Sequence, residues 1–184
     1  CSLAWELLTE LTFKTTSRNQ RILNMDSHKK LVDLLHDFDT AMLVTRGEDG
    51  AMDARPMAVV KVEDDGQLWF VTDRHSGKIA DLKFDSEVAI TMQRSNRFVS
   101  LSGTATIVDD QPTLDALWQE TWRVWFPEGK ASESIILIRI QPTQGEYWDN
   151  SGLTGLKYLL KAGTAYLQSK KPETDASTNA TVSF

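Results

Sequence analysis

The chain has 184 residues, of which 41% are hydrophobic and 25% are charged. This composition is typical of a globular protein of about one domain and excludes a largely disordered, collagenous or coiled-coil chain. Its 20 Lys and Arg residues against 26 Asp and Glu residues give a net charge of −6, which argues against nucleic-acid binding, and its single cysteine excludes a disulfide within the chain.

The ends of the chain differ from its middle. Met25, the first methionine, directly precedes a clear helical pattern, so we expect residues 1–24 to be an extension that need not be native. The alternative is a genuine N-terminal helix in this segment, because four of its leucines have helical spacing. The domain is expected over residues 25–168, and the polar residues 169–184 are expected to be a disordered tail. Without a long apolar run or a secretory signal, we expect a cytoplasmic protein with no membrane partner.

The hydrophobic pattern predicts one helix and then a series of strands. Asp26 or Ser27 can cap a helix whose apolar face carries leucines and Phe38. Period-two alternation and tight turns follow, among them Asp64-Asp65-Gly66. The expected strands are Thr40–Arg46, Ala54–Glu63, Gln67–Thr72, Val88–Gln93, Phe98–Val108 and Ser134–Gln141, with Gly145–Asp149 extending or pairing with the last.

Further helices are expected between and after these strands. They cover Lys78–Phe84, a segment from Asp109 to about Trp125, and Leu153–Leu167. The middle helix would place Trp118, Trp122 and Trp125 at i, i+4 and i+7. This spacing favours a stripe packed in the core or against a dimer partner over a surface for docking another protein.

Six strands joined mostly by hairpins must pair antiparallel, and closing them into a small barrel removes exposed edges. The predicted fold class is mainly β with flanking helices, arranged as a six-stranded antiparallel β-barrel. The sequence holds no nucleophile elbow, P-loop or dinucleotide fingerprint, so no catalytic residue is assigned. We also expect no metal site, because His28 and His36 lie too far apart on one helix to share an ion.

One group of residues suits a phosphate. Ser76, Gly77 and Lys78 offer a hydroxyl, free backbone N–H groups and an ammonium at the start of a predicted helix. Arg55, on a neighbouring predicted strand, could add a bidentate contact. A capping serine beside a solvated lysine and an edge arginine would give the same pattern, so spacing alone leaves both interpretations open.

The segment MDARPMAVVKVEDDGQLWFVTDRHSGKIADLKFDSEVAITM resembles the core of the flavin-binding split-barrel superfamily of pyridoxamine 5′-phosphate oxidase. The motifs ARPM, WFVTD, SGKIADL and EYWD are most similar to its general stress protein 26 branch, and the likeness runs from about Ser27 to Leu160. The resemblance implies a six-stranded antiparallel split β-barrel that forms a homodimer. It also implies FMN, with FAD as the alternative, bound at the subunit interface.

By position, the resemblance implies a role for each of several residues. Arg55 and Lys78 would hold the flavin phosphate, with Ser76 and Gly77 beside them. The residues that would line the ring and the ribityl chain are Pro56, Met57, Val71 and Thr72. Trp148 would be an aromatic neighbour of the flavin, although packing in the core or in the dimer interface explains it equally well.

The chain departs from the oxidase pattern in three places. Gly77 stands where the oxidase has a phosphate-binding arginine, which Arg74 or His75 could replace. Phe98 stands where the oxidase has a glutamine, and no histidine follows Trp148, so the Arg-x-His substrate motif is missing. Oxidation of pyridoxamine phosphate is therefore not expected.

Two functions remain after these departures. One is a flavin-dependent oxidoreductase acting on a small molecule, and the alternative is a non-catalytic flavin-binding or storage protein of the stress response. The missing substrate motif favours the alternative, whereas Arg55 and Lys78 fit both. Haem is disfavoured, because His75 is the sole axial ligand offered near the expected pocket.

Overall fold

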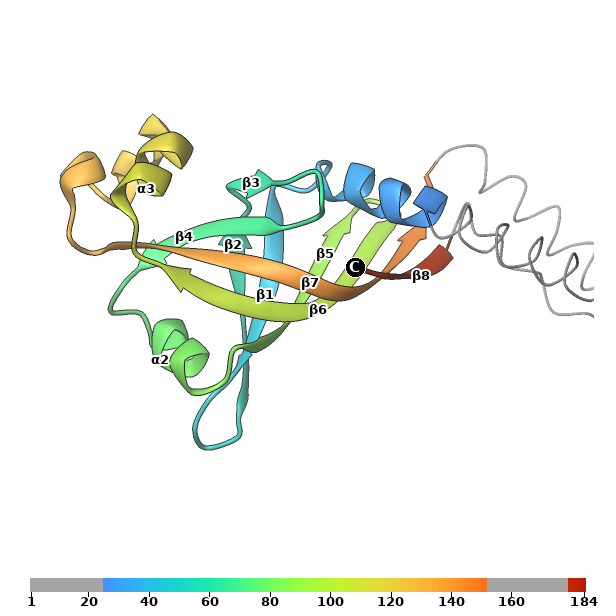
Figure 1. The fold of residues 1–184 in the computed structure, drawn as a ribbon, viewed down its shortest axis with the longest axis horizontal. Helices are drawn as coiled ribbons and strands as arrows, with labels where there is room; N and C mark the ends of the chain where they lie inside the picture. The colour runs from blue at the N-terminus through green and yellow to red at the C-terminus, as the bar shows by residue number, and fades with distance from the viewer. Residues whose placement is uncertain (1–24, 152–178) are drawn as a thin grey trace, which may run out of the picture.

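The computed structural model describes residues 25–151 and 179–184 (Figure 1). After a helix over residues 25–35, eight strands form one antiparallel sheet in the order β2-β1-β5-β6-β7-β4-β3, with β8 added beside β7. The strands are β1 (Thr40–Arg46), β2 (Met52–Ala58), β3 (Lys61–Val62), β4 (Leu68–Asp73), β5 (Glu87–Arg94), β6 (Arg97–Val108), β7 (Ile135–Asp149) and β8 (Asn179–Ser183). The helices α2 (Gly77–Phe84) and α3 (Gln111–Leu117) and the 3-10 turns η1 (Glu120–Val124) and η2 (Gly129–Ala131) interrupt them.

A short connection brings the two edges of this sheet together. β2 and β3 are the ends of the seven-strand path, yet only Val59 and Val60 separate them in the chain. The sheet must therefore curl until its edges meet, and β2 and β4 approach each other without pairing. The result is a split antiparallel β-barrel, which confirms the predicted fold class with eight strands in place of six.

The barrel core follows from alternation along the strands. In β1, Ala41, Leu43 and Thr45 are buried while the intervening side chains are more exposed. β7 differs, because four consecutive residues, Ile135–Ile138, are all buried. One face of this stretch packs in the barrel, and the other packs against a second apolar cluster that includes Leu114, Trp122 and Phe126. The α3–η1 segment is thereby fixed on the outside of β7.

Figure 1 shows α2 and α3 at one end of the sheet, and the helix over residues 25–35 with β8 at the other end. The N-terminal helix closes its end of the barrel, since Leu31 and Leu35 belong to the same core cluster as Tyr147 and Val182. The end that carries α2 and α3 holds the residues discussed below.

Several element boundaries differ from those expected. The predicted strand Ala54–Glu63 is two strands, because the chain turns at Val59–Val60 to pass from one sheet edge to the other. Ser134–Gln141 and Gly145–Asp149 belong to one strand, β7, which pairs with β6 past a bulge at Gly103.

The helix expected to run to Trp125 is wrong. α3 ends at Leu117, where Trp118 takes an extended conformation, and η1 follows. Trp122 is buried in the second cluster, whereas Trp125 is 66% exposed, so the three tryptophans do not form one stripe.

The predicted disordered tail, residues 169–184, is wrong for its last part, because Asn179–Ser183 form β8 and pair with β7. The expected helix Leu153–Leu167 and the extension over residues 1–24 lie outside the described residues.

Candidate functional site

A cavity lies where the barrel is split. β2 pairs only with β1, and β4 pairs with β7 on one side but with β3 only at Leu68 and Trp69, among the described residues. The rest of β4 therefore has a free edge that faces the free edge of β2. Between them lies a cavity of about 420 Å³. Its lining residues are Pro56, Met57 and Ala58 from β2, Val71, Thr72 and Asp73 from β4, and Trp125 and Phe126 from the turn after η1.

The start of α2 adjoins this cavity. Ser76 is the N-cap residue, but its side chain makes no capping hydrogen bond and instead lies with its Oγ 3.4 Å from Thr72 Oγ1. The Lys78 ammonium donates a hydrogen bond of 2.8 Å to the same Thr72 oxygen. Gly77 is exposed and has open space where a side chain would project. Ser76 and Lys78 thus both contact Thr72, which lines the cavity, although neither they nor Gly77 line it themselves.

Arg55 lies on β2 directly before Pro56, which lines the cavity, but Arg55 does not line the cavity itself. Its Nη1 donates to Thr45 Oγ1, and its Nη2 lies 3.1 Å from Asp81 Oδ2, an ion pair in which both side chains are largely buried. Thr45 Oγ1 in turn donates to Asp81 Oδ2 over 2.7 Å. The three side chains form a closed ring that ties β1, β2 and α2 together.

Arg55 and Lys78 are both partly buried cations. Burial lowers the pKa of Lys78, and the nearby Arg55 guanidinium lowers it further, while Asp73 and Asp81 act in the opposite direction. Repulsion between the cations is an unfavourable energy that a bound anion would relieve. This electrostatic state, together with the hydroxyl of Ser76 and the open N–H groups near Gly77, suits a phosphate.

Reasoning from the sequence missed several residues of this site. Asp81 could have been noticed, since it follows Lys78 by three residues and so lies on the same face of α2. Thr45 carries no local signal, because it looks like an ordinary inward-facing strand residue. Trp125 and Phe126 reach the cavity because α3 ends at Leu117 and the chain continues through η1. The continuous helix expected from the sequence did not indicate this arrangement.

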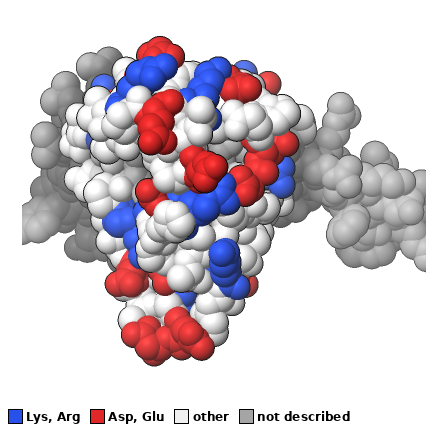
Figure 2. Space-filling view, turned by 90° about the vertical axis from the view of Figure 1, so that its left-hand side faces the viewer, with Lys and Arg blue, Asp and Glu red and all other residues white. Residues whose placement is uncertain are grey.

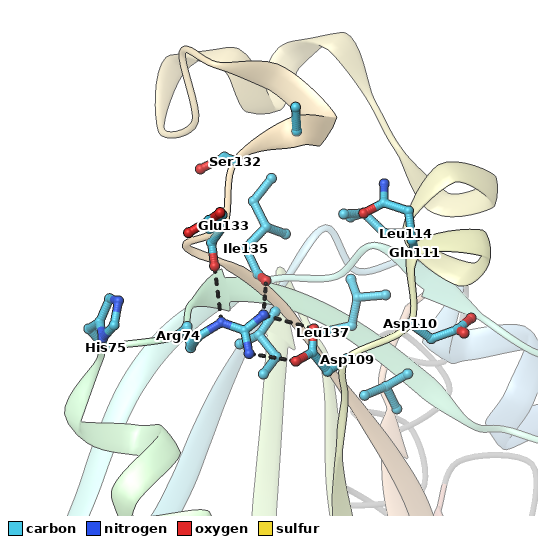
Figure 3. Close-up of a pocket in the computed structure, with 13 residues that line it drawn as sticks. Arg74, His75, Asp109, Asp110, Gln111, Leu114, Ser132, Glu133, Ile135 and Leu137 are labelled. Atoms are coloured by element: carbon cyan, nitrogen blue, oxygen red, sulfur yellow. Dashed lines mark hydrogen bonds and ion pairs between the residues drawn. The ribbon is translucent and has the colours of Figure 1, made fainter.

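Arg74 does not join the group formed by Ser76 and Lys78. Its guanidinium makes a bidentate pair with Asp109, at 2.6 and 2.7 Å, and also donates to the backbone oxygens of Glu133 and Ile135. Figure 3 shows these contacts in a separate cavity of about 480 Å³ between β4, β7 and the start of α3. The expectation that Arg74 replaces the missing arginine is therefore wrong. His75 lies at the rim of that same cavity.

Trp148 does not reach the cavity within one chain. It pairs with Phe98 on β6, eleven residues along β7 from Leu137, the partner of Val71. At about 3.3 Å per residue, this separation is roughly 35 Å along the strand. Trp148 instead lines an apolar groove of about 290 Å³ together with Met42 and Phe98.

Charge on the open end of the molecule is mixed. Figure 2 shows basic and acidic side chains interspersed over most of this face, with acidic ones gathered at the tip formed by the β1–β2 turn. An anion reaching the cavity would thus be held by particular cations and not by a broad basic surface. Within residues 25–151 and 179–184, no acidic, His or Cys cluster suits a metal ion, and no helix is long and apolar enough to cross a bilayer.

Comparison with known proteins defines the class. The family model described as pyridoxamine 5′-phosphate oxidase like matches residues 26–173. The chain is 31% identical over 143 residues to protein bli-3 of Neurospora crassa, covering 67% of this chain and 68% of that protein.

Solved structures agree with that match. The general stress FMN/FAD binding protein of Xanthomonas citri is 28% identical, with a TM-score of 0.60 over 70% of this chain and 92% of that one. A Jannaschia sp. structure assigned to general stress protein 26 is 23% identical, with a TM-score of 0.65 over 88% of this chain and 99% of that one, and supports the fold. The chain belongs to the pyridoxamine 5′-phosphate oxidase-like family.

Proposed function

We propose that this protein binds FMN, with FAD as the alternative, in the cavity between β2 and β4. The observation that carries the proposal is the pair of cations, Arg55 and Lys78, with Lys78 and the hydroxyl of Ser76 both beside Thr72, which lines a mainly apolar cavity. A flavin mononucleotide has the same division, with an anionic phosphate at one end and a flat, largely apolar ring at the other. The FMN/FAD binding relative from Xanthomonas citri supports this assignment.

Each part of the cavity would hold a different part of the ligand. Arg55 and Lys78 would bind the phosphate by charge-assisted hydrogen bonds, with Ser76 and the N–H groups near Gly77 adding neutral ones. Pro56, Met57 and Val71 would contact the ring and the ribityl chain. Because the facing edges of β2 and β4 carry no strand partner among the described residues, their backbone groups can bond to the polar rim of the ring.

We propose further that the protein acts as a homodimer with the flavin near the interface. Trp148 would then contact the ring as Trp148 of the partner subunit, since within one chain it lines a different groove. The exposed Met42 and Phe98 in that groove, 38% and 36% accessible, are apolar side chains that a subunit interface would cover. Light scattering coupled to gel filtration should give twice the chain mass, and a monomer would contradict this part of the proposal.

The bound flavin would supply electron transfer, so the protein need only position the ring and admit a reaction partner. We propose that it is a flavin-dependent oxidoreductase acting on a small molecule, and its stress-protein relatives support a role in a stress response. Steady oxidation of NADH or NADPH by the flavin-loaded protein would support turnover. A loaded protein that oxidises neither would support the non-catalytic flavin-binding alternative.

Flavin binding itself is tested by adding FMN to the purified protein, desalting it and recording its visible spectrum. We expect flavin bands to stay with the protein and FMN fluorescence to change on titration. Riboflavin, which lacks the phosphate, should bind at least about tenfold more weakly, because it forgoes a charged hydrogen bond. No retained colour and no fluorescence change would overturn the proposal, and equal affinity for FMN and riboflavin would overturn the phosphate assignment.

A further inference from the structure

Asp81 presents a carboxylate next to the two cations proposed to bind the phosphate. A carboxylate is an unexpected neighbour for an anion site, because it repels an anionic ligand and already forms an ion pair with Arg55. Its Oδ2 accepts from both Arg55 Nη2 at 3.1 Å and Thr45 Oγ1 at 2.7 Å, and its side chain is only 16% exposed. The contact is thus a built part of the barrel and not an incidental surface pair.

The ring of contacts restrains Arg55 strongly. One side of the guanidinium is held by Thr45, the other by Asp81, and Thr45 bonds directly to Asp81. Thr45 is completely buried on β1, so it has little freedom to move. An arginine side chain has several rotatable bonds and loses entropy when a ligand fixes it. Because the ring fixes Arg55 before any ligand arrives, that loss does not weaken ligand binding.

The same ring also sets the distance between the two cations. Asp81 and Lys78 belong to one short helix, and Asp81 fastens that helix to Arg55 on β2. Lys78 precedes Asp81 by three residues, so the two side chains lie on the same face of α2, and Arg55 is 3.1 Å from that same Asp81. Without Asp81, repulsion would favour arginine conformers that turn away from Lys78.

We propose that Asp81 is a positioning residue of the phosphate site, which holds Arg55 through hydrogen bonds so that both cations face the same anion. This inference rests on the proposed flavin binding and adds to it a residue that does not touch the ligand. Asp81 acts through its hydrogen-bond-accepting oxygen, while its negative charge by itself weakens the binding of an anion.

Two substitutions separate the oxygen from the charge. Asp81→Ala and Asp81→Asn both remove the negative charge, but only asparagine keeps an oxygen that can accept from Arg55 and Thr45. We expect D81N to bind FMN about tenfold more tightly than D81A, the lower end of the effect of a hydrogen bond to a charged group. Riboflavin should bind both variants equally, because it has no phosphate to be held by Arg55.

The matched control is Asp53→Ala. Asp53 also faces Arg55, but at 3.9 Å and with a side chain 65% exposed, so it should contribute little. D53A is expected to keep the wild-type affinity for FMN within about twofold. If either Asp81 variant fails to fold, Thr45→Val is the second test, since it removes the other hydrogen-bonding partner of Arg55 while valine keeps the shape of the threonine side chain. This variant should have a lower affinity for FMN and an unchanged affinity for riboflavin.

The measurement is a fluorescence titration of each variant with FMN and with riboflavin. Equal FMN affinity in D81N and D81A would overturn the inference, and so would parallel losses of FMN and riboflavin, which would indicate only a structural role. Wild-type protein that binds FMN in those cases would leave the proposed function intact. Wild-type protein that binds neither ligand would overturn both.

Discussion

Replacing Lys78 by methionine should weaken FMN binding while leaving the ligand-free protein at least as stable. Methionine keeps most of the length and packing of the lysine stem but removes the ammonium, which is held 2.8 Å from Thr72 Oγ1. Losing one charged hydrogen bond to the phosphate costs about 1.5–3 kcal/mol, which corresponds to a dissociation constant raised about 10- to 150-fold. Stability should not fall, because burial and Arg55 both disfavour the charged form of Lys78 in the folded protein.

The assay is a fluorescence titration with FMN and riboflavin, combined with urea unfolding of the ligand-free variant. Lys83→Met is the matched control, since Lys83 lies on the same helix, is exposed, and should leave both flavin affinities unchanged. The affinity for riboflavin should be the same in K78M and in the wild type. An unchanged FMN affinity in K78M, or an equal loss for both flavins, would show that Lys78 does not bind the phosphate.

Three more predictions concern the site and its barrel. Because the pKa of Lys78 is lowered in the folded protein, the folded state binds fewer protons than the unfolded chain between the folded pKa and 10.5. In that pH window the free energy of unfolding of the ligand-free protein, measured with urea, should therefore rise with pH, and K78M should lack this rise. Identical pH profiles for the wild type and K78M would contradict the prediction. Trp125→Ala should leave the melting temperature nearly unchanged, since the ring is 66% exposed, but should weaken flavin binding about 2- to 10-fold in a titration if Trp125 stacks on the ligand. Gly103→Ala should lower the free energy of unfolding, measured with urea, by about 1–3 kcal/mol, because the new Cβ would lie 2.3 Å from the backbone oxygen of Gln141. An unaltered urea midpoint would show that the backbone at the bulge relaxes to accommodate the methyl group.

Local patterns were sufficient for most of the barrel. Thr40–Arg46 forms the expected strand and alternates in burial, and Gly66, with φ of 86°, completes the hairpin expected at Asp64-Asp65-Gly66. The position of Ser76, Gly77 and Lys78 at the start of a helix was also predictable, because the three residues are adjacent in the chain. These features depend on neighbours in the chain, and periodicity and turn chemistry describe such neighbours well.

The meeting of distant segments could not be predicted from local patterns and follows from the closed fold. Residues 59–60 look like the middle of a strand in the sequence, but they carry the chain from one sheet edge to the other. Closing the barrel in this way protects the edge strands, which a longer single strand would leave exposed. The expected helix ends at Leu117, and Trp122 lies in the separate turn η1, because its burial in the second cluster outweighs helical continuity. β8 likewise forms from a polar segment because an available strand edge of β7 supplies its partner.

The same distinction holds for the site. Residue types and their spacing were enough to suggest which groups could bind a phosphate, namely Arg55, Ser76 and Lys78. They did not determine the partners of these groups, since Arg55 meets Asp81 across 26 residues, and Arg74 turns away to Asp109 across 35. An arginine binds whichever carboxylate the fold brings within reach, and that proximity is a property of the closed barrel and not of local spacing.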